Sequence, residues 1–281
     1  MSTCLAFVDG APASKLSLLD RGLHYGDGLF ETIAVRTVPH RNIADYPLWG
    51  NHYQRLLQGC ERLGIPCPSQ GLLEDEIRSF FSHFSLPLPS IIKLILTRGS
   101  AGRGYSPRDN TSTRILIGYP WPNYPKCFWT EGITVTISDI YLSRNPYLAG
   151  IKHLNRLEQV MAASRMGAFD EALMCDMNGD VIEGTRTNLF AVINNELQTP
   201  LLNEVGIKGV MRSFILSLCK HEGIPVKENA IRQDELIRAS EIFVCNGVLG
   251  IWPVKQVLST PLRVGPTTLR LANLIKEKIV C

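Results

Sequence analysis

Apolar positions in the first half of the chain alternate between strand-like runs and helical spacing. Four apolar or β-branched runs predict strands at residues 5–8, 29–35, 91–97 and 114–118. A helix is predicted where apolar side chains recur at helical spacing, at Tyr53, Leu56, Leu57, Cys60 and Leu63. Gly64 and Pro66 end this helix, and a weaker helical pattern covers residues 72–81. Strands and helices are therefore mixed in this half.

The second half follows a similar pattern, and a proline-rich segment separates the two. Strands are predicted at residues 133–138, 171–176, 181–183, 189–192, 242–245 and 251–254. Helices are predicted around 154–161, 210–219 and 267–276. Three prolines within residues 120–125 cannot continue a helix or a central strand. We therefore expect an N-terminal domain at 1–119, a linker at 120–125 and a larger C-terminal domain at 126–281.

Composition narrows the class of protein without identifying it. The chain has 281 residues, 45% hydrophobic and 20% charged, which is typical of a globular protein with a substantial core. The net charge of +3, without a run of basic residues, does not indicate a nucleic-acid surface. Eight scattered cysteines indicate free thiols rather than a disulfide framework. The sequence shows no signal peptide and no membrane-length apolar run, so a cytoplasmic location is expected.

Polar segments within apolar surroundings are the candidates for chemistry. The first, residues 21–32, contains Gly22, Gly26 and Gly28 and permits either a plain turn or close approach to a ligand. The second places Lys152 between an extended segment and a helix, where it could act as a nucleophile or simply be solvated. No phosphate-binding P-loop, zinc-ligand or serine-hydrolase motif accompanies them. No metal site is expected.

Two further segments lie in the second half. Glu183 interrupts an apolar strand, so its carboxylate needs a partner, either a protonated ring nitrogen or a structural arginine such as Arg186. Residues 206–212 place a glycine directly before a helix, and the free backbone N–H groups of such a helix start can bind an anion. Many helices begin in this way without any ligand.

Taken together, these segments resemble the class IV aminotransferase family of pyridoxal-phosphate enzymes. Residues 98–105 (RGSAGRGY) and 144–159 (RNPYLAGIKHLNRLEQ) resemble the lyase branch, which acts on 4-amino-4-deoxychorismate. The resemblance implies an α+β fold of type IV, with a small N-terminal α/β domain and a larger domain with a barrel-like sheet. It also implies that pyridoxal 5'-phosphate lies between these domains, in a homodimer.

The resemblance assigns a role to each matching position. Lys152 would be the catalytic residue and would bind the cofactor as a Schiff base, and Glu183 would keep the pyridine nitrogen protonated. Arg55 would bind the phosphate, together with the backbone of Val210 and Met211. The turn formed by Asn246 and Gly247 would add donors, although aminotransferases often carry a hydroxyl residue at the position of Gly247.

The expected reaction converts 4-amino-4-deoxychorismate to 4-aminobenzoate and pyruvate in folate biosynthesis, with aminodeoxychorismate synthase supplying the substrate. Because that substrate carries two acidic functions, we expect Arg98, Arg103, Tyr105 and Phe30 to bind it. Phe30 and Glu31 also resemble the aminotransferase branch, so an aminotransferase of branched-chain or D-amino acids stays open. A binding protein that has kept the fold without catalysis is a third interpretation.

Overall fold

The computed structural model describes residues 5–36, 46, 48–100, 103–107 and 111–279, and the chain divides into two compact units. Unit 1 comprises Met1–Pro122 and Ile151–Asn155, and unit 2 comprises Asn123–Gly150 and Arg156–Cys281. The segment with Lys152 therefore groups with the first unit, whereas we expected it in the C-terminal domain at 126–281. It does so because its backbone bonds to a strand of unit 1: Phe30 N–H donates to the Lys152 carbonyl at 2.9 Å.

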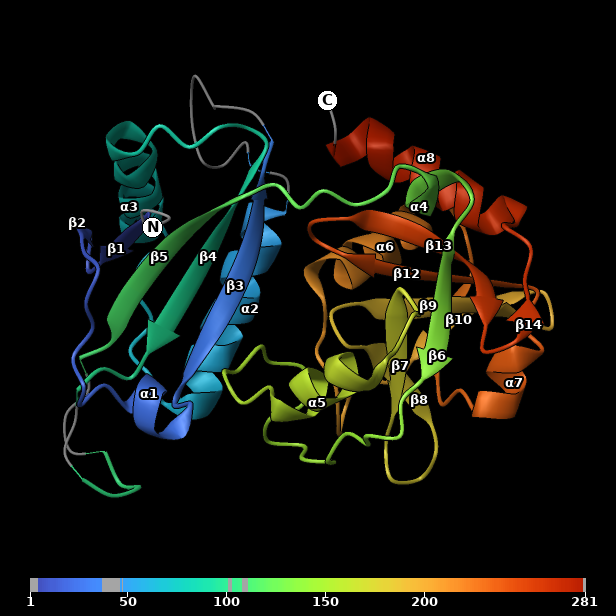
Figure 1. The fold of residues 1–281 in the computed structure, drawn as a ribbon, viewed down its shortest axis with the longest axis horizontal. Helices are drawn as coiled ribbons and strands as arrows, with labels where there is room; N and C mark the ends of the chain where they lie inside the picture. The colour runs from blue at the N-terminus through green and yellow to red at the C-terminus, as the bar shows by residue number, and fades with distance from the viewer. Residues whose placement is uncertain (1–4, 37–45, 47, 101–102, 108–110, 280–281) are drawn as a thin grey trace. The chain divides into compact units, whose positions relative to one another are not determined.

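A five-stranded antiparallel sheet forms the centre of unit 1 (Figure 1). Its strands run in the spatial order β2-β1-β5-β4-β3, which leaves β3 at an edge. The strands are β1 (Ala6–Val8), β2 (Ala11–Pro12), β3 (Gly28–Val35), β4 (Ser90–Thr97) and β5 (Thr113–Pro120).

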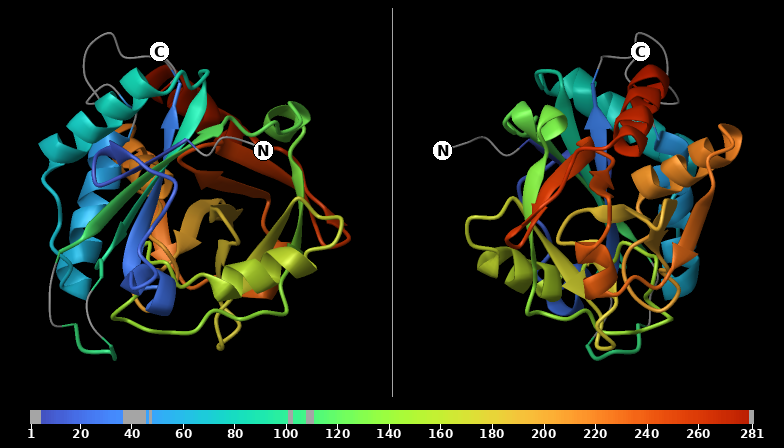
Figure 2. Two further views of the ribbon diagram at one scale, coloured as in Figure 1. Left: turned by 60° about the vertical axis from the view of Figure 1, so that its left-hand side comes forward. Right: turned by 90° about the vertical axis from the view of Figure 1, so that its right-hand side faces the viewer.

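Two long helices, α2 (Trp49–Leu63) and α3 (Gln70–His83), cover one face of this sheet (Figures 1 and 2). Gly59 of α2 lies against Leu29 of β3, and a side chain at this position would meet Leu29 at 2.8 Å. Phe80 of α3 packs edge-on against Phe7 at 5.2 Å. The helix α2 ends at Gly64 in a left-handed conformation, as the glycine predicts. A short helix, α1 (Arg21–Tyr25), precedes β3.

Side chains on the opposite face of the unit 1 sheet are only half-buried. Because side chains alternate along a strand, the register that pairs Phe30 with Ile95 and Thr32 with Lys93 places these four residues on one face. Glu31 and Leu29 point to the helix-covered face and are buried. The candidate site of unit 1 lies at the edge strand β3, on this half-buried face.

Unit 2 contains a nine-stranded sheet that curls on itself (Figure 2). Its spatial order is β11-β10-β9-β12-β13-β6-β7-β8, with β14 paired to β13. The edge strand β8 is joined to the interior strand β9 by a tight turn, in which Gly184 N–H donates to the Thr187 carbonyl at 2.7 Å. This turn requires the sheet to curl, and the curl matches the expected barrel-like form. The strands are β6 (Ile133–Ile137), β7 (Glu171–Cys175), β8 (Val181–Gly184), β9 (Asn188–Ile193), β10 (Glu196–Pro200), β11 (Val226–Asn229), β12 (Glu241–Asn246), β13 (Gly250–Val257) and β14 (Thr260–Pro261).

Five helices accompany this sheet, and apolar side chains from the strands form the core of unit 2. The helices are α4 (Cys127–Thr130), α5 (Leu157–Arg165), α6 (Val210–His221), α7 (Gln233–Ile237) and α8 (Pro266–Ile279). Trp252 is fully buried and packs edge-on against Tyr124 and Phe128 at 4.7 and 5.1 Å. Thus Tyr124, in the predicted linker, belongs to this core.

The long elements lie where the hydrophobic pattern predicts them, and helices and strands mix in both units as an α+β fold requires. The predicted helix around Leu154 is the exception, since α5 begins only at Leu157. Leu154 instead lies in a bend before the helix, and its N–H donates to the Gly28 carbonyl at 3.0 Å. Among the described residues, no helix is both long and apolar enough to cross a membrane. The cysteines within the described ranges are free thiols: Cys60, Cys67, Cys127, Cys175, Cys219 and Cys245.

Candidate active site

Lys152 lies beside the edge strand of unit 1. The segment that carries it bonds to β3 through the Lys152 carbonyl and the Leu154 N–H, on either side of His153. Gly28 permits this approach, because a side chain there would lie 2.5 Å from the Leu96 carbonyl and 2.9 Å from the Leu154 side chain. The Lys152 ammonium nitrogen lies 4.4 Å from the centre of the Phe30 ring. A cation–π contact at this distance holds the amine over the half-buried face of the sheet.

A second ammonium group approaches the same ring. Lys93 projects from β4 on the Phe30 side of the sheet, and its nitrogen lies 5.1 Å from the ring centre. Our sequence analysis missed Lys93, although a lysine between Ile92 and Leu94 in an otherwise apolar strand was a usable signal. Phe30, predicted to contact substrate, therefore lies between two amines that can attract anions.

Arg55 lies on the other, helix-covered side of β3. Its guanidinium pairs with Glu31: Nε donates to Oε1 at 2.8 Å and Nη2 donates to Oε2. His52, one turn earlier on α2, contacts the same carboxylate through Nδ1 at 2.6 Å. Burial raises the pKa of Glu31, but the charge of Arg55 and the hydrogen bonds of His52 and Arg55 outweigh it and lower the pKa to about 2. Glu31 is thus ionised at neutral pH.

His52 links this cluster to Lys152. Burial lowers the pKa of His52, the contact with Glu31 opposes this, and the charges of Arg55 and Lys152 lower it further. The histidine is therefore neutral, and its Nδ1–H donates to the Glu31 carboxylate. Arg55 and His52 therefore form a buried cluster around Glu31 on the helix-covered side of β3, whereas Lys152 lies over Phe30.

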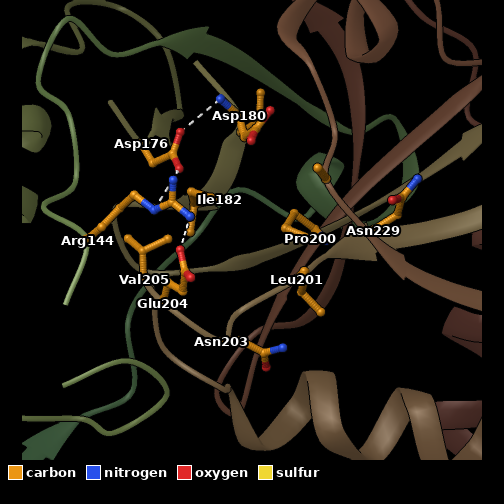
Figure 3. A pocket seen from close by; sticks show the side chains of 12 residues that line it. Arg144, Asp176, Asp180, Ile182, Pro200, Leu201, Asn203, Glu204, Val205 and Asn229 are labelled. Carbon is orange, nitrogen blue, oxygen red and sulfur yellow. Dashed lines mark hydrogen bonds and ion pairs between the residues drawn. The ribbon is translucent and has the colours of Figure 1, made fainter. Parts of the chain in front are cut away.

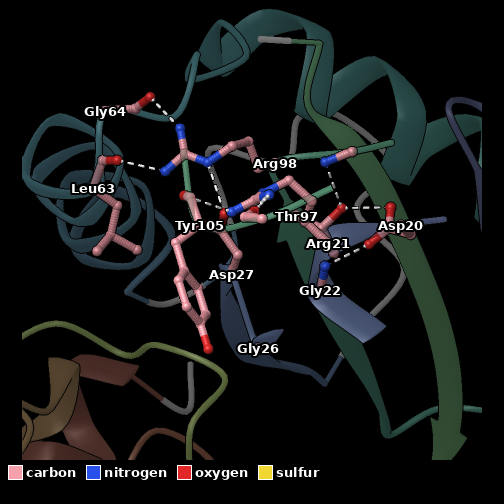
Figure 4. A network of polar contacts seen from close by, with 12 residues as sticks. Asp20, Arg21, Gly22, Gly26, Asp27, Leu63, Gly64, Thr97, Arg98 and Tyr105 are labelled. Carbon is pink, nitrogen blue, oxygen red and sulfur yellow. Dashed lines mark hydrogen bonds and ion pairs between the residues drawn. The ribbon is translucent and has the colours of Figure 1, made fainter. Parts of the chain in front are cut away.

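Arg98 has a different environment from the one we predicted (Figure 4). It is buried, and its guanidinium donates to the Leu63 and Gly64 carbonyls at 2.6 and 2.7 Å, at the end of α2. Its Nε donates to Asp27 at 2.8 Å. These contacts anchor a helix end to the turn before β3, where a cation also interacts favourably with the helix dipole. They favour a structural role for Arg98, and its predicted contact with substrate stays untested.

The glycine-rich loop after Arg98 is held by Arg21, which donates to the Gly104 and Tyr105 carbonyls at 2.7 and 3.1 Å (Figure 4). Arg103 is exposed, and Tyr105 is 88% exposed with its ring 5.6 Å from that of Tyr25. Residues 101–102 of the loop lie outside the described residues. The predicted substrate contacts of Arg103 and Tyr105 therefore rest on accessible side chains.

Glu183 is the buried carboxylate of unit 2. It is 3% exposed, accepts a hydrogen bond from Ile207 N–H at 2.8 Å, and contacts the Gln159 amide nitrogen at 3.3 Å. Gly206 adopts a left-handed conformation beside it, and a side chain there would approach Glu183 Oε2 to 3.3 Å. Arg186, the structural partner that the sequence left open, instead donates to the Asp170 carbonyl and lies 3.7 Å from Glu171.

The predicted phosphate-binding backbone lies at the start of α6. Gly209 precedes the helix, no side chain caps it, and Val210 and Met211 form its first turn. A side chain at position 209 would clash with Asn188, which donates to the Ile207 carbonyl at 2.9 Å. This glycine-led start leaves backbone N–H groups available to an anion.

Asn246 and Gly247 form the turn after β12. The Asn246 side-chain oxygen accepts hydrogen bonds from Val248 and Leu249 N–H, both at 2.9 Å, and its amide donates to the Arg186 carbonyl at 3.1 Å. The side chain thus builds the turn, so any contact with an anion would come from the backbone. The predicted role of this turn stays a prediction.

Unit 2 also contains a cavity of about 250 Å³ (Figure 3). Arg144 lines it, ion-paired with Glu204 and 3.7 Å from Asp176. The strand β8 contributes Val181 and Ile182 to its wall. The residues predicted to bind cofactor and substrate are not in its lining, so this cavity is distinct from the Glu183 carboxylate site.

Comparisons with known proteins agree with these features. An aminodeoxychorismate lyase of Vibrio harveyi is 32% identical over 255 residues, covering 89% of this chain and 90% of the relative. The crystal structure of 4-amino-4-deoxychorismate lyase from Pseudomonas aeruginosa superposes with a TM-score of 0.89 at 39% identity, covering 98% of this chain and 99% of that one. The fold is also that of a T.th. branched-chain amino acid aminotransferase with pyridoxamine 5'-phosphate, with a TM-score of 0.84, 24% identity, and coverage of 98% and 93%.

These likenesses cover both units rather than one, and they confirm the α+β fold of type IV. The model of the family "Amino-transferase class IV" matches residues 28–257, which include Lys152, Arg55 and Glu183. The chain belongs to the class IV aminotransferase family.

Proposed function

We propose that this protein is a pyridoxal-phosphate-dependent aminodeoxychorismate lyase, which converts 4-amino-4-deoxychorismate to 4-aminobenzoate and pyruvate. The observation that carries the proposal is the likeness to the Pseudomonas aeruginosa lyase, at 39% identity over nearly the full length of both chains. Lys152 supports it independently, because the amine is presented beside the edge strand and an aromatic ring.

The described residues fit pyridoxal 5'-phosphate in each unit considered alone. Unit 1 offers an amine at Lys152 for the aldehyde and a guanidinium at Arg55 for the phosphate. Unit 2 offers the buried carboxylate of Glu183 for a protonated ring nitrogen and the uncapped start of α6 for an anion. Glu183 already accepts hydrogen bonds from Ile207 and Gln159, and a protonated ring nitrogen would add a charged partner.

The side chains have distinct tasks in the proposed reaction. When bound, pyridoxal phosphate supplies an electron sink for the electron pair of a broken C–H bond. Lys152 would hold the cofactor covalently through its amine, and as a free amine it would accept the proton from the substrate carbon that bears nitrogen. Glu183 holds a proton at the ring nitrogen. Loss of pyruvate from the substrate then leaves an aromatic ring, and aromatisation favours this step.

The same residues leave aminotransferase activity as the second candidate function. Glu31 and Phe30 match the aminotransferase branch, and Glu31 is the buried partner of Arg55. An aminotransferase must return an amino group from a donor, whereas a lyase turns over without an acceptor. Incubation with branched-chain or D-amino acids and 2-oxoglutarate tests this alternative, and rapid glutamate formation would favour it.

Recognition of the acidic substrate is proposed for cations around the Phe30 ring and on the glycine-rich loop. Lys93 lies on the Phe30 face of the sheet, and Arg103 and Tyr105 are exposed on the loop. A homodimer, a cytoplasmic location and substrate supply by aminodeoxychorismate synthase are proposed from the family resemblance alone.

A cofactor spectrum tests the shared basis of both enzymatic proposals. The purified protein should show a visible absorption band that borohydride abolishes, and the reduced peptide should contain Lys152. A protein that takes up no pyridoxal phosphate would instead support a binding protein without catalysis.

A further inference from the structure

Three side chains of unit 1 meet between β3 and α2. Glu31 comes from the strand, and His52 and Arg55 lie three residues apart on one face of the helix. The side chains of Glu31, His52 and Arg55 are 1%, 2% and 10% exposed. They are therefore fixed by two regular elements and by burial rather than by a mobile loop.

The contacts within this cluster define the orientation of the guanidinium. Arg55 uses Nε and Nη2 for the two carboxylate oxygens of Glu31, which is a planar, two-point contact. His52 donates to Glu31 Oε2 at 2.6 Å and so holds the carboxylate itself. The two-point contact fixes the plane of the guanidinium, and the directions of its remaining N–H groups follow from that plane.

Net charge alone does not explain the arrangement. Glu31 is ionised and cancels the charge of Arg55, so the pair attracts an anion less strongly than an isolated arginine would. The gain is in orientation, because a long arginine side chain otherwise loses rotamer freedom when it binds a ligand. Neutral His52 strengthens the carboxylate's position without adding charge.

We propose that Glu31, held by His52, is a positioning residue that orients Arg55 toward the phosphate ester of the cofactor. This inference rests on the proposed function, in which Arg55 binds that phosphate. Glu31 acts only through Arg55, so its removal should affect ligands that carry phosphate and not those that lack it.

The test measures cofactor affinity rather than activity. The full-length protein is stripped of cofactor and titrated with pyridoxal 5'-phosphate and with pyridoxal, which lacks the phosphate. The variants are Glu31→Gln, Arg55→Ala and the double variant. Glu76→Gln is the matched control, since Glu76 is another buried carboxylate of unit 1 paired with an arginine, Arg114, at 2.8 Å.

Glu31→Gln should weaken binding of pyridoxal phosphate about tenfold, a loss typical of residues that orient a direct ligand. Pyridoxal affinity should not change, and Glu31→Gln should cause no further loss in the Arg55→Ala background. The control Glu76→Gln should lower thermal stability and leave both affinities unchanged. His52→Asn, which keeps a donor near the position of Nδ1, should retain more affinity than His52→Leu, and this pair keeps the test valid if Glu31→Gln does not fold.

Several results would overturn the inference. Equal losses for pyridoxal phosphate and pyridoxal would indicate a general structural role for Glu31. A tighter affinity in Glu31→Gln would show that repulsion between carboxylate and phosphate outweighs orientation. Unchanged affinity of Arg55→Ala for pyridoxal phosphate would refute phosphate binding by Arg55 itself. A loss of affinity in Arg55→Ala but not in Glu31→Gln would refute only the positioning role of Glu31.

Discussion

Replacement of Glu183 by glutamine should separate chemistry from folding. The carboxylate accepts a hydrogen bond from Ile207 N–H at 2.8 Å and contacts the Gln159 amide nitrogen at 3.3 Å. A glutamine can keep its oxygen toward Ile207. Its amide can donate to Gln159 once the Gln159 side-chain amide turns over and presents its oxygen, which is buried and has no hydrogen-bond partner among the described residues.

The two expected effects differ in size. Since both contacts can be preserved, the variant should lose about 1 kcal/mol of stability or less, or a few degrees in Tm. A neutral amide cannot hold a proton on a ring nitrogen, and a hydrogen bond between charged groups contributes about 1.5–3 kcal/mol. A loss of about 3 kcal/mol in the barrier corresponds to a rate about 100-fold lower.

The assay compares turnover at saturating cofactor with the amount of cofactor bound. Glu183→Gln should still bind pyridoxal phosphate. Its rate of pyruvate release should be about 100-fold lower than that of the parent. The control is Glu241→Gln, since Glu241 is buried in the same unit but accepts hydrogen bonds from Thr268 at the start of α8. The control should lose stability and keep its rate. A Glu183→Gln protein with near-normal turnover would refute the role of this carboxylate.

Four further predictions concern unit 1. Lys152→Ala should abolish turnover and the borohydride-reducible link, and peptide mapping that finds the link on another lysine would contradict the assignment. Arg55→Ala should raise the Kd for pyridoxal phosphate about 10- to 100-fold, from a loss of about 1.5–3 kcal/mol, with a smaller effect on kcat at saturation; an unchanged Kd would leave Arg55 only as the structural partner of Glu31. Arg103→Ala should raise the KM for the dianionic substrate and leave the cofactor spectrum unaltered. Arg98→Ala should mainly lower Tm. Equal KM values in Arg103→Ala and the parent would show that Arg103 does not bind the substrate. The pKa of Glu31 falls from its ordinary 4.5 to about 2 on folding. Its ionised form therefore stabilises the fold fully above pH 4.5, and this stabilisation is lost as the pH falls toward 2. In urea unfolding, the parent should lose about 3 kcal/mol of unfolding free energy over this range through Glu31, and Glu31→Gln should not show this loss.

The sequence predicted those features that depend on neighbours along the chain. The apolar spacing of α2 and the glycine that ends it are local, as are the two polar segments that led to Lys152 and Glu183. Leu154 shows where this fails: helical spacing includes it, but its backbone bonds to Gly28, far away in sequence, and it lies outside the helix. Long-range backbone pairing therefore outweighed local propensity.

Arg98 illustrates the same limit for a candidate site residue. On a glycine-rich loop, an arginine is expected to be solvated or to bind a ligand. Its partners Asp27, Leu63 and Gly64 lie 71, 35 and 34 residues earlier, and only the fold brings them together. The sequence analysis missed Lys93 because its relevance depends on a distant contact. Its ammonium group and that of Lys152 both lie near the Phe30 ring, and its own sequence neighbours do not indicate this.

One measurement tests the central claim most directly. The purified protein is incubated with 4-amino-4-deoxychorismate, with pyridoxal phosphate present and no amino acceptor, and both products are quantified over many turnovers. The account predicts pyruvate and 4-aminobenzoate in equal amounts, at a rate that added 2-oxo acids do not change. Product formation that stops after one turnover, or that requires a 2-oxo acid, would contradict a lyase and indicate an aminotransferase.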